Sequence, residues 1–239
     1  MLLRSIAVLT AANVLNNKIA PRLAPLTSAA ATAALVAMAR GHGVSWRELG
    51  FEKASRGAAV GGALATAVAA VYTVGISVPR TRPLFHDERA LSLSRARVLE
   101  ESLLQVPLGT VLLEEVGFRG ALHGMLARRH GPAAATAVSS ALFGLWHILP
   151  AIDMARANPA LGALTAGESP ARLDVARVVA GSVVSTAAAG VLFCELRRRG
   201  GLLAPSMLHL ATNSLGYLFA RISAKAGRDG RGKTSSGRG

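Results

Sequence analysis

Long stretches without Asp, Glu, Lys or Arg recur along the chain and constrain its fold more than any other feature. They cover residues 23–39, 57–79, 131–152, 178–194 and 200–220. Since an α-helix rises about 1.5 Å per residue, about 20 apolar residues cross a hydrocarbon core of roughly 30 Å. Lipid offers no hydrogen-bond partner to the backbone, so such stretches must be helical. The sequence therefore predicts a bundle of transmembrane α-helices.

Two further spans are less obvious from hydropathy. Residues 102–127 have a spanning length and an apolar background, but charged side chains interrupt them. Residues 5–12 form a short apolar run, which we take as a first, marginal membrane helix because no clear signal-peptide cleavage site follows it. The predicted fold class is therefore all-α, a polytopic integral membrane bundle of about seven transmembrane helices, with six to eight as the range.

The composition and the net charge also indicate an integral membrane protein. Hydrophobic residues make up 51% of the 239 residues and charged residues 17%, and the mean hydropathy is +0.39, which is typical of a membrane protein. The net charge of +14 comes from arginines at the edges of apolar runs and near the C-terminus, a pattern of membrane topology rather than of nucleic-acid binding. We expect the lipid bilayer as a partner and no nucleic acid.

The chain divides into one long domain and a short tail. Residues 1–220 are predicted to form a single transmembrane domain. Residues 221–239 are rich in Lys, Arg, Gly and Ser and cannot bury enough apolar surface to fold, so they are predicted to be a disordered basic tail. The abundance of Ala, Arg and Gly suggests a GC-rich bacterial genome, and we expect a multi-pass protein of the bacterial inner membrane.

The first polar motif is Glu114-Glu115-Val-Gly-Phe-Arg119, inside an otherwise apolar helix. A charge near the bilayer centre costs at least about 2.5–3.5 kcal/mol on insertion scales, so three charges demand an explanation. Glu115 and Arg119 are four residues apart, in the order that favours an ion pair along the helix. Glu114 points about 100° away on a regular helix and is left without a structural explanation.

Two more polar motifs follow on later helices. Phe143 and His147 are four residues apart in one span, and His209 and Asn213 are four residues apart in the last span, so each pair shares a helix face. Each motif alone is compatible with a simple interhelical hydrogen bond. Together, three polar faces on apolar helices indicate a functional site.

The ordered set Glu-Glu-x-x-x-Arg, Phe-x-x-x-His and His-x-x-x-Asn resembles the CAAX protease and bacteriocin-processing family, also called Abi. Its eukaryotic branch contains the endopeptidase that trims prenylated CAAX proteins. The resemblance covers about residues 103–218, roughly half of the chain. It implies an intramembrane endopeptidase of the glutamic type, without a metal or other cofactor, that acts on a membrane-associated peptide or protein.

The resemblance also implies a role for each motif residue. Glu114 corresponds to the glutamate that activates the hydrolytic water, and His147 to the histidine that shares this water. His209 and Asn213 correspond to the pair that stabilises the oxyanion. Glu115, Arg119 and Phe143 are the supporting residues of the motifs.

The same residues are compatible with other functions. Glu114, His147 and His209 could instead form a two-histidine, one-glutamate zinc site with an open fourth position, although the sequence has no His-Glu-x-x-His motif. A non-catalytic membrane binding protein, for example one that confers bacteriocin immunity, is the alternative of another class. A proton-coupled transporter using Glu114 is disfavoured because the sequence lacks an internal repeat.

Overall fold

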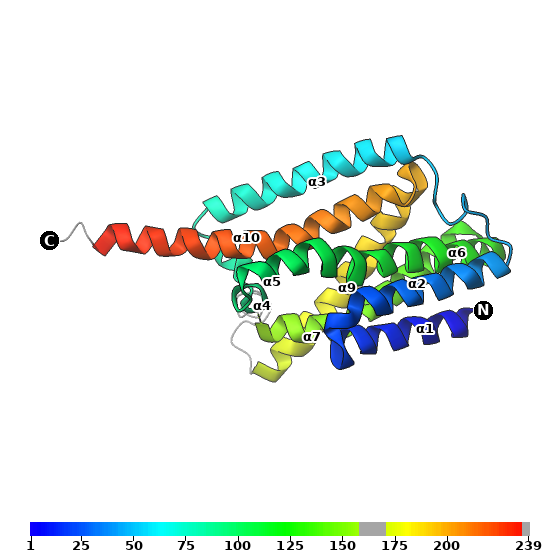
Figure 1. Cartoon of the computed structure of the whole chain (residues 1–239), viewed down its shortest axis with the longest axis horizontal. Coiled ribbons are helices and arrows are strands. Elements are labelled where there is room, and N and C mark those ends of the chain that lie inside the picture. Colours follow the sequence, from blue (N-terminus) through cyan, green and yellow to red (C-terminus); the bar gives the residue numbers. More distant parts are fainter. Residues whose placement is uncertain (158–170, 236–239) are drawn as a thin grey trace.

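The protein is a bundle of helices (Figure 1). The computed structural model describes the backbone of residues 1–157 and 171–235 and the side chains of residues 1–156 and 175–225. The elements in these ranges are α1 (Leu2–Val14), η1 (Leu15–Ile19), η2 (Pro21–Leu23), α2 (Ala24–Gly41), α3 (Ala54–Ser77), η3 (Arg82–Phe85), α4 (Glu88–Leu91), α5 (Arg95–Glu100), η4 (Glu101–Val111), η5 (Leu113–Leu122), α6 (His123–Trp146), α7 (Ile148–Ala157), α9 (Ala171–Gly200) and α10 (Leu203–Ser235). The described part of the chain has no strand, so the predicted all-α class is confirmed.

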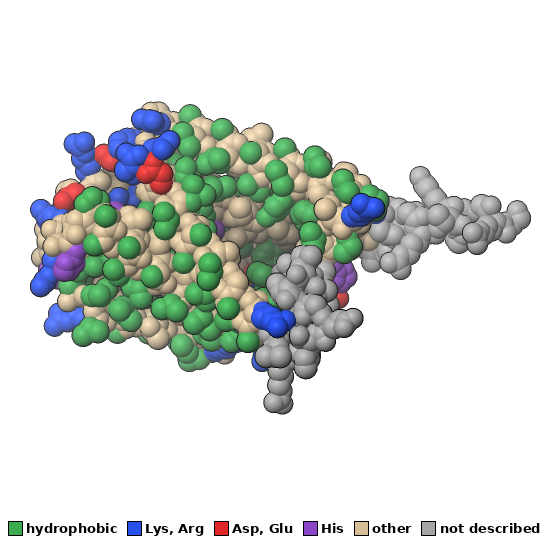
Figure 2. Space-filling model, turned by 180° about the vertical axis from the view of Figure 1, so that it is seen from behind, with side chains coloured by type: hydrophobic (Ala, Val, Ile, Leu, Met, Phe, Trp, Pro, Cys, Tyr) green, Lys and Arg blue, Asp and Glu red, His purple; other side chains and the backbone are tan. Residues whose placement is uncertain are grey.

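Within the described ranges, four helical stretches are long and apolar enough to cross a membrane. They are Pro21–Gly41, Ala54–Ser77, Arg95–Arg156 and Val175–Gly200. On the face drawn in Figure 2, hydrophobic side chains cover the flank of the bundle, and Lys and Arg lie mainly toward its ends. Charge at the ends and apolar surface between them suit a bilayer, so the chain is an integral membrane protein. The prediction of about seven spans also includes α1 and α10, which are not among these four stretches.

The longest of these stretches is a helical hairpin rather than one helix. Gly131 breaks it with φ 81° and ψ 165°, a conformation that glycine adopts without a steric penalty. Contacts pair residues at increasing distance on either side of this break: His123 with Thr136, Phe118 with Phe143, and Glu114 with Trp146. The second leg of α6 therefore returns antiparallel to η5, as expected from the predicted spans 102–127 and 131–152.

The first leg of the hairpin differs from the regular α-helix that the sequence predicts. Residues Glu101–Val111 and Leu113–Leu122 are π-helical, with wider hydrogen bonds from residue i+5 to residue i. Pro107 lies inside η4 and has no N–H to donate, and its carbonyl accepts the N–H of Leu112, five residues later. Such wide turns are uncommon and often occur at functional sites.

The N-terminal helices cover one side of this leg. α1 and η1 form one continuous run, the chain turns at Ala20, and α2 then packs antiparallel to α1 and against η4 and η5. The main core lies between these helices and α6. Its large buried side chains are Leu9, Leu35, Leu113, Phe118, Leu122, Met125, Phe143 and Trp146.

α10 packs chiefly against α3, and α9 packs against α6. A Cβ atom added at Gly57 would collide with the carbonyl oxygen of Gly200, so only glycine lets α3 approach the turn between α9 and α10.

α10 continues to Ser235, past the boundary at Arg221 where the tail was predicted to begin. Arg221 donates to the backbone carbonyls of Ala90 and Leu93, and Ser223 donates to that of Arg82, so these residues belong to the bundle. The backbone of residues 226–235 is helical, and the disorder predicted for residues 221–239 stays a prediction.

Candidate active site

Glu114 lies on η5 at the centre of the polar motifs and is only 3% exposed. Its Oε1 accepts a hydrogen bond from Trp146 Nε1 at 2.8 Å. Its Oε2 is buried and has no hydrogen-bond partner among the described residues. Two imidazole nitrogens face this oxygen, His209 Nε2 at 3.6 Å and His147 Nε2 at 3.8 Å. These distances exceed a direct hydrogen bond but leave both nitrogens within reach of one small bridging molecule such as water.

Glu115 and Arg119 form the predicted ion pair on the buried side of the same helix. Arg119 Nη1 lies 3.5 Å from Glu115 Oε1, and both side chains are 1% exposed. The guanidinium also donates to the Glu114 carbonyl at 3.1 Å and lies over the Phe143 ring, 3.6 Å from its centroid. Arg119 is thus held by a carboxylate, a backbone carbonyl and an aromatic face, and it compensates one of the two buried glutamates.

The two histidine rings have defined orientations. His147 Nδ1 lies 2.8 Å from the carbonyl oxygen of Phe143, and His209 Nδ1 lies 2.8 Å from Glu115 Oε1. A carbonyl or carboxylate oxygen only accepts, so each Nδ1 carries the proton and each Nε2 is turned towards Glu114. The ring of His209 also packs against Phe193 of α9, with 5.2 Å between ring centroids.

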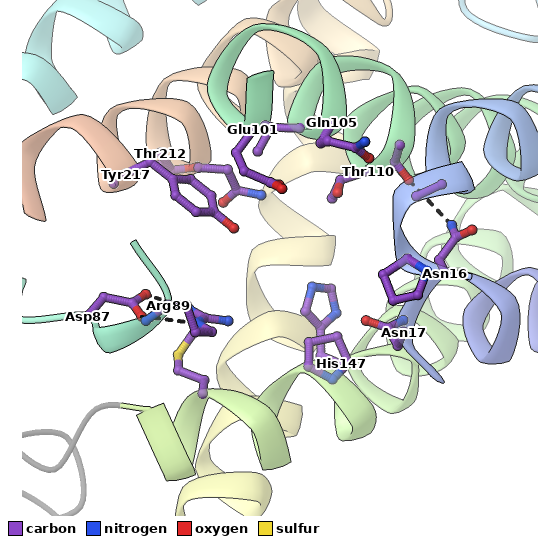
Figure 3. A pocket seen from close by; sticks show the side chains of 18 of the residues that line it. Asn16, Asn17, Asp87, Arg89, Glu101, Gln105, Thr110, His147, Thr212 and Tyr217 are labelled. Atoms are coloured by element: carbon purple, nitrogen blue, oxygen red, sulfur yellow. Dashed lines mark hydrogen bonds and ion pairs between the residues drawn. The ribbon is translucent and has the colours of Figure 1, made fainter. Parts of the chain in front are cut away.

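A cavity of about 700 Å³ lies against this cluster. Figure 3 shows His147 pointing into the cavity, with Asn17 beside it and Asp87, Arg89 and Tyr217 on the other side. The cavity is therefore lined by polar groups from the N-terminal helices, from the segment around α4 and from α10.

Of the four residues predicted to be catalytic, Glu114, His147 and Asn213 line the cavity. His209 is not part of its wall, but lies directly behind it against Glu114. Asn213 is half-buried and makes no hydrogen bond to the described residues, so its amide is available to a molecule in the cavity. The structure thus brings Glu114, His147 and His209 together and places Asn213 on the wall of the same cavity.

Three residues of the site were missed at the level of the sequence. Trp146 binds the Glu114 carboxylate, Phe193 packs on His209, and Asn13 donates to the carbonyl of Trp146 at 2.8 Å. Trp146 could have been noticed, since it is next to His147 and a buried indole N–H needs an acceptor. Phe193 and Asn13 carry no such signal, because their contacts depend on how distant helices pack.

The described residues include no group of three or more His, Cys, Asp or Glu side chains arranged to hold a metal ion. A direct metal assay of the purified protein distinguishes the zinc site from a metal-free site.

A protein-family model matches the part of the chain that carries the polar motifs. Residues 102–215 match the model of a family described as Type II CAAX prenyl endopeptidase Rce1-like. No curated protein and no solved structure matches the chain. The matched segment contains η4, η5, α6 and the first part of α10, and thus all three polar motifs. Through residues 102–215, just under half of its length, the chain is similar to this family, which supports the resemblance to the CAAX protease and bacteriocin-processing family.

Proposed function

We propose that the protein is a glutamic-type intramembrane endopeptidase in which Glu114 activates the hydrolytic water. One observation carries this proposal: Glu114 Oε2 is buried at the cavity wall, has no hydrogen-bond partner among the described residues, and faces two imidazole nitrogens. A buried acceptor left unpaired is costly in a purely structural element. A water that is bound and activated at this oxygen accounts for it.

The reaction begins when Glu114 Oε2 takes a proton from this water and the water oxygen attacks the carbonyl carbon of the substrate. His147 Nε2 shares the water, because its Nδ1 proton is already committed to the Phe143 carbonyl. The C–N bond then breaks, and the proton taken from the water passes to the leaving amine. The products are a new carboxyl terminus and a new amino terminus.

His209 and Asn213 stabilise the oxyanion that forms on the carbonyl oxygen. To act as a donor, His209 needs an N–H at Nε2 in addition to the Nδ1–H that the Glu115 carboxylate binds. Each oxyanion donor in a site that excludes water typically contributes about 2.7–4 kcal/mol to transition-state stabilisation.

The substrate in this proposal is a membrane-associated peptide or protein that enters the cavity beside Glu114. The polar lining accommodates an extended backbone, since asparagine, glutamine and threonine side chains offer both donors and acceptors. The cellular site is a bacterial inner membrane, which the chain crosses several times.

The test compares the wild-type protein with Glu114→Gln, both purified and reconstituted in lipid. A farnesylated CAAX peptide is the defined substrate, and sequencing of membrane-protein termini in expressing cells searches for others. Glu114→Gln should abolish cleavage, because an amide cannot accept the proton from water. Glu195→Gln is the matched control, since the Glu195 side chain is 36% exposed and, among the described residues, pairs with Arg198 and Arg199.

Cleavage of a genuine substrate by Glu114→Gln at the wild-type rate would refute the general-base role. Cleavage by neither protein, with tight binding of a membrane partner that survives in Glu114→Gln, would favour the non-catalytic binding protein instead.

A further inference from the structure

The indole of Trp146 has a specific relation to the Glu114 carboxylate. Trp146 is the last residue of α6 and is 8% exposed. Its N–H donates to Glu114 Oε1 at 2.8 Å, while Glu114 Oε2 receives no hydrogen bond within the described chain. The two oxygens of one carboxylate therefore stand in different environments.

We propose that Trp146 is a positioning residue that assigns separate tasks to these oxygens: Oε1 is the anchored oxygen and Oε2 is the base. This inference rests on the proposed function of Glu114. The terminal torsion of a glutamate is broad, so a carboxylate without an anchor rotates freely. The indole N–H restricts this rotation and keeps Oε2 directed at the Nε2 atoms of His147 and His209.

Trp146 is itself held by two contacts. Its ring meets Phe118 edge to face, with centroids 5.5 Å apart. Its backbone carbonyl lies at the end of α6 and accepts a hydrogen bond from Asn13 Nδ2 at 2.8 Å. Asn17 in turn donates to Asn13 Oδ1 at 2.9 Å.

Asn13 and Asn17 belong to α1 and η1, outside the segment 102–215 that matches the family. A chain of hydrogen bonds thus runs from the N-terminal helix through Trp146 to the base. The N-terminal helices support the active site by this route, in addition to lining the cavity.

The first test is spectroscopic and needs no substrate. The chain has two tryptophans, and Trp46 is 54% exposed in the turn between α2 and α3. Trp46→Phe leaves Trp146 as the only indole in the full-length protein. Its ultraviolet resonance Raman spectrum reports the hydrogen bond of the indole N–H. We expect a bonded N–H that becomes unbonded when Glu114→Ala is added, and no change when Glu195→Ala is added.

The second test is kinetic and uses Trp146→Phe, which keeps an aromatic ring against Phe118 but removes the N–H. Losing a hydrogen bond to a charged group should lower kcat by about 10- to 100-fold. KM should stay within about twofold, because Trp146 is proposed to act on the base rather than on the substrate. Trp46→Phe alone should retain wild-type kinetics.

Three results would overturn the inference. The first is a Raman spectrum in which the Trp146 N–H is unbonded, which can be measured even if Trp146→Phe fails to fold. The second is an unchanged kcat in a folded Trp146→Phe protein. The third is a loss confined to KM. If instead Glu114→Gln cleaves at the wild-type rate while the Trp146 N–H of the Glu114 protein is hydrogen-bonded, the general-base role of Glu114 is wrong. The hydrogen bond between Trp146 and Glu114 then still stands.

Discussion

Substitution of Arg119 tests whether its positive charge compensates the buried glutamates of the site. Its guanidinium is 1% exposed, lies 3.5 Å from Glu115 Oε1 and 3.6 Å from the centroid of the Phe143 ring, and donates to the Glu114 carbonyl. Arg119→Met removes the charge and keeps much of the volume. It leaves the two buried glutamates without the guanidinium that lies beside them.

Breaking a buried ion pair on one side typically costs about 3–5 kcal/mol. Folded domains are stable by only about 5–15 kcal/mol. Arg119→Met should therefore remove a large part of the free energy of unfolding. Arg119→Met/Glu115→Gln removes one positive and one negative charge together, and the amide oxygen of Gln still accepts from His209 Nδ1. The double variant should therefore be more stable than the single Arg119→Met variant.

The measurement is the free energy of unfolding in mixed detergent micelles, for wild type, both single variants and the double variant. A double-mutant cycle then gives the coupling between the two side chains. We expect a coupling of at least about 1 kcal/mol in the direction that rescues Arg119→Met. Additive effects, or a cost of Arg119→Met below about 1 kcal/mol, would refute the idea that this pair neutralises the site.

Further predictions concern the oxyanion, metal, packing and pH. Asn213→Ala should retain measurable cleavage in the assay with the farnesylated CAAX peptide, with kcat reduced by about 10²–10³, because one oxyanion donor is lost and the base remains. Metal analysis of the purified protein should find no stoichiometric zinc, and activity should survive exhaustive chelation; one equivalent of zinc lost together with activity would establish the two-histidine, one-glutamate site. Gly57→Leu should lower Tm by several degrees because it separates α3 from the α9–α10 turn, whereas Gly181→Ala, which meets nothing within 4 Å, should not. Hydrogen bonds from the backbone and side chain of Ser45 lower the pKa of Glu48. The stability that Glu48 contributes is therefore present above its unfolded pKa of about 4.5 and is lost as pH falls through the lower folded pKa. Glu48→Gln should remove this part of the dependence of Tm on pH.

The sequence alone determined the helical class and identified the residues of the three polar motifs. Charge-free runs of spanning length leave a chain in lipid no alternative to helices, so the fold class follows from local composition. The motif residues could be predicted because buried charge is costly and because residues four apart share a helix face. The two legs of the hairpin were also predicted, since residues 102–127 and 131–152 were expected to be separate spans.

The tertiary structure decided the contacts that give these residues their chemistry. The bond from Trp146 to Glu114 depends on the antiparallel return of α6, and the bond from Asn13 to Trp146 joins residues 133 positions apart. The π-helical winding of η5 also departs from the regular spacing that sequence arguments assume. Hydropathy and helical periodicity describe one segment at a time. Which oxygen of Glu114 is anchored and which faces the histidines is a property of helices packed together, because each partner comes from a different segment of the chain.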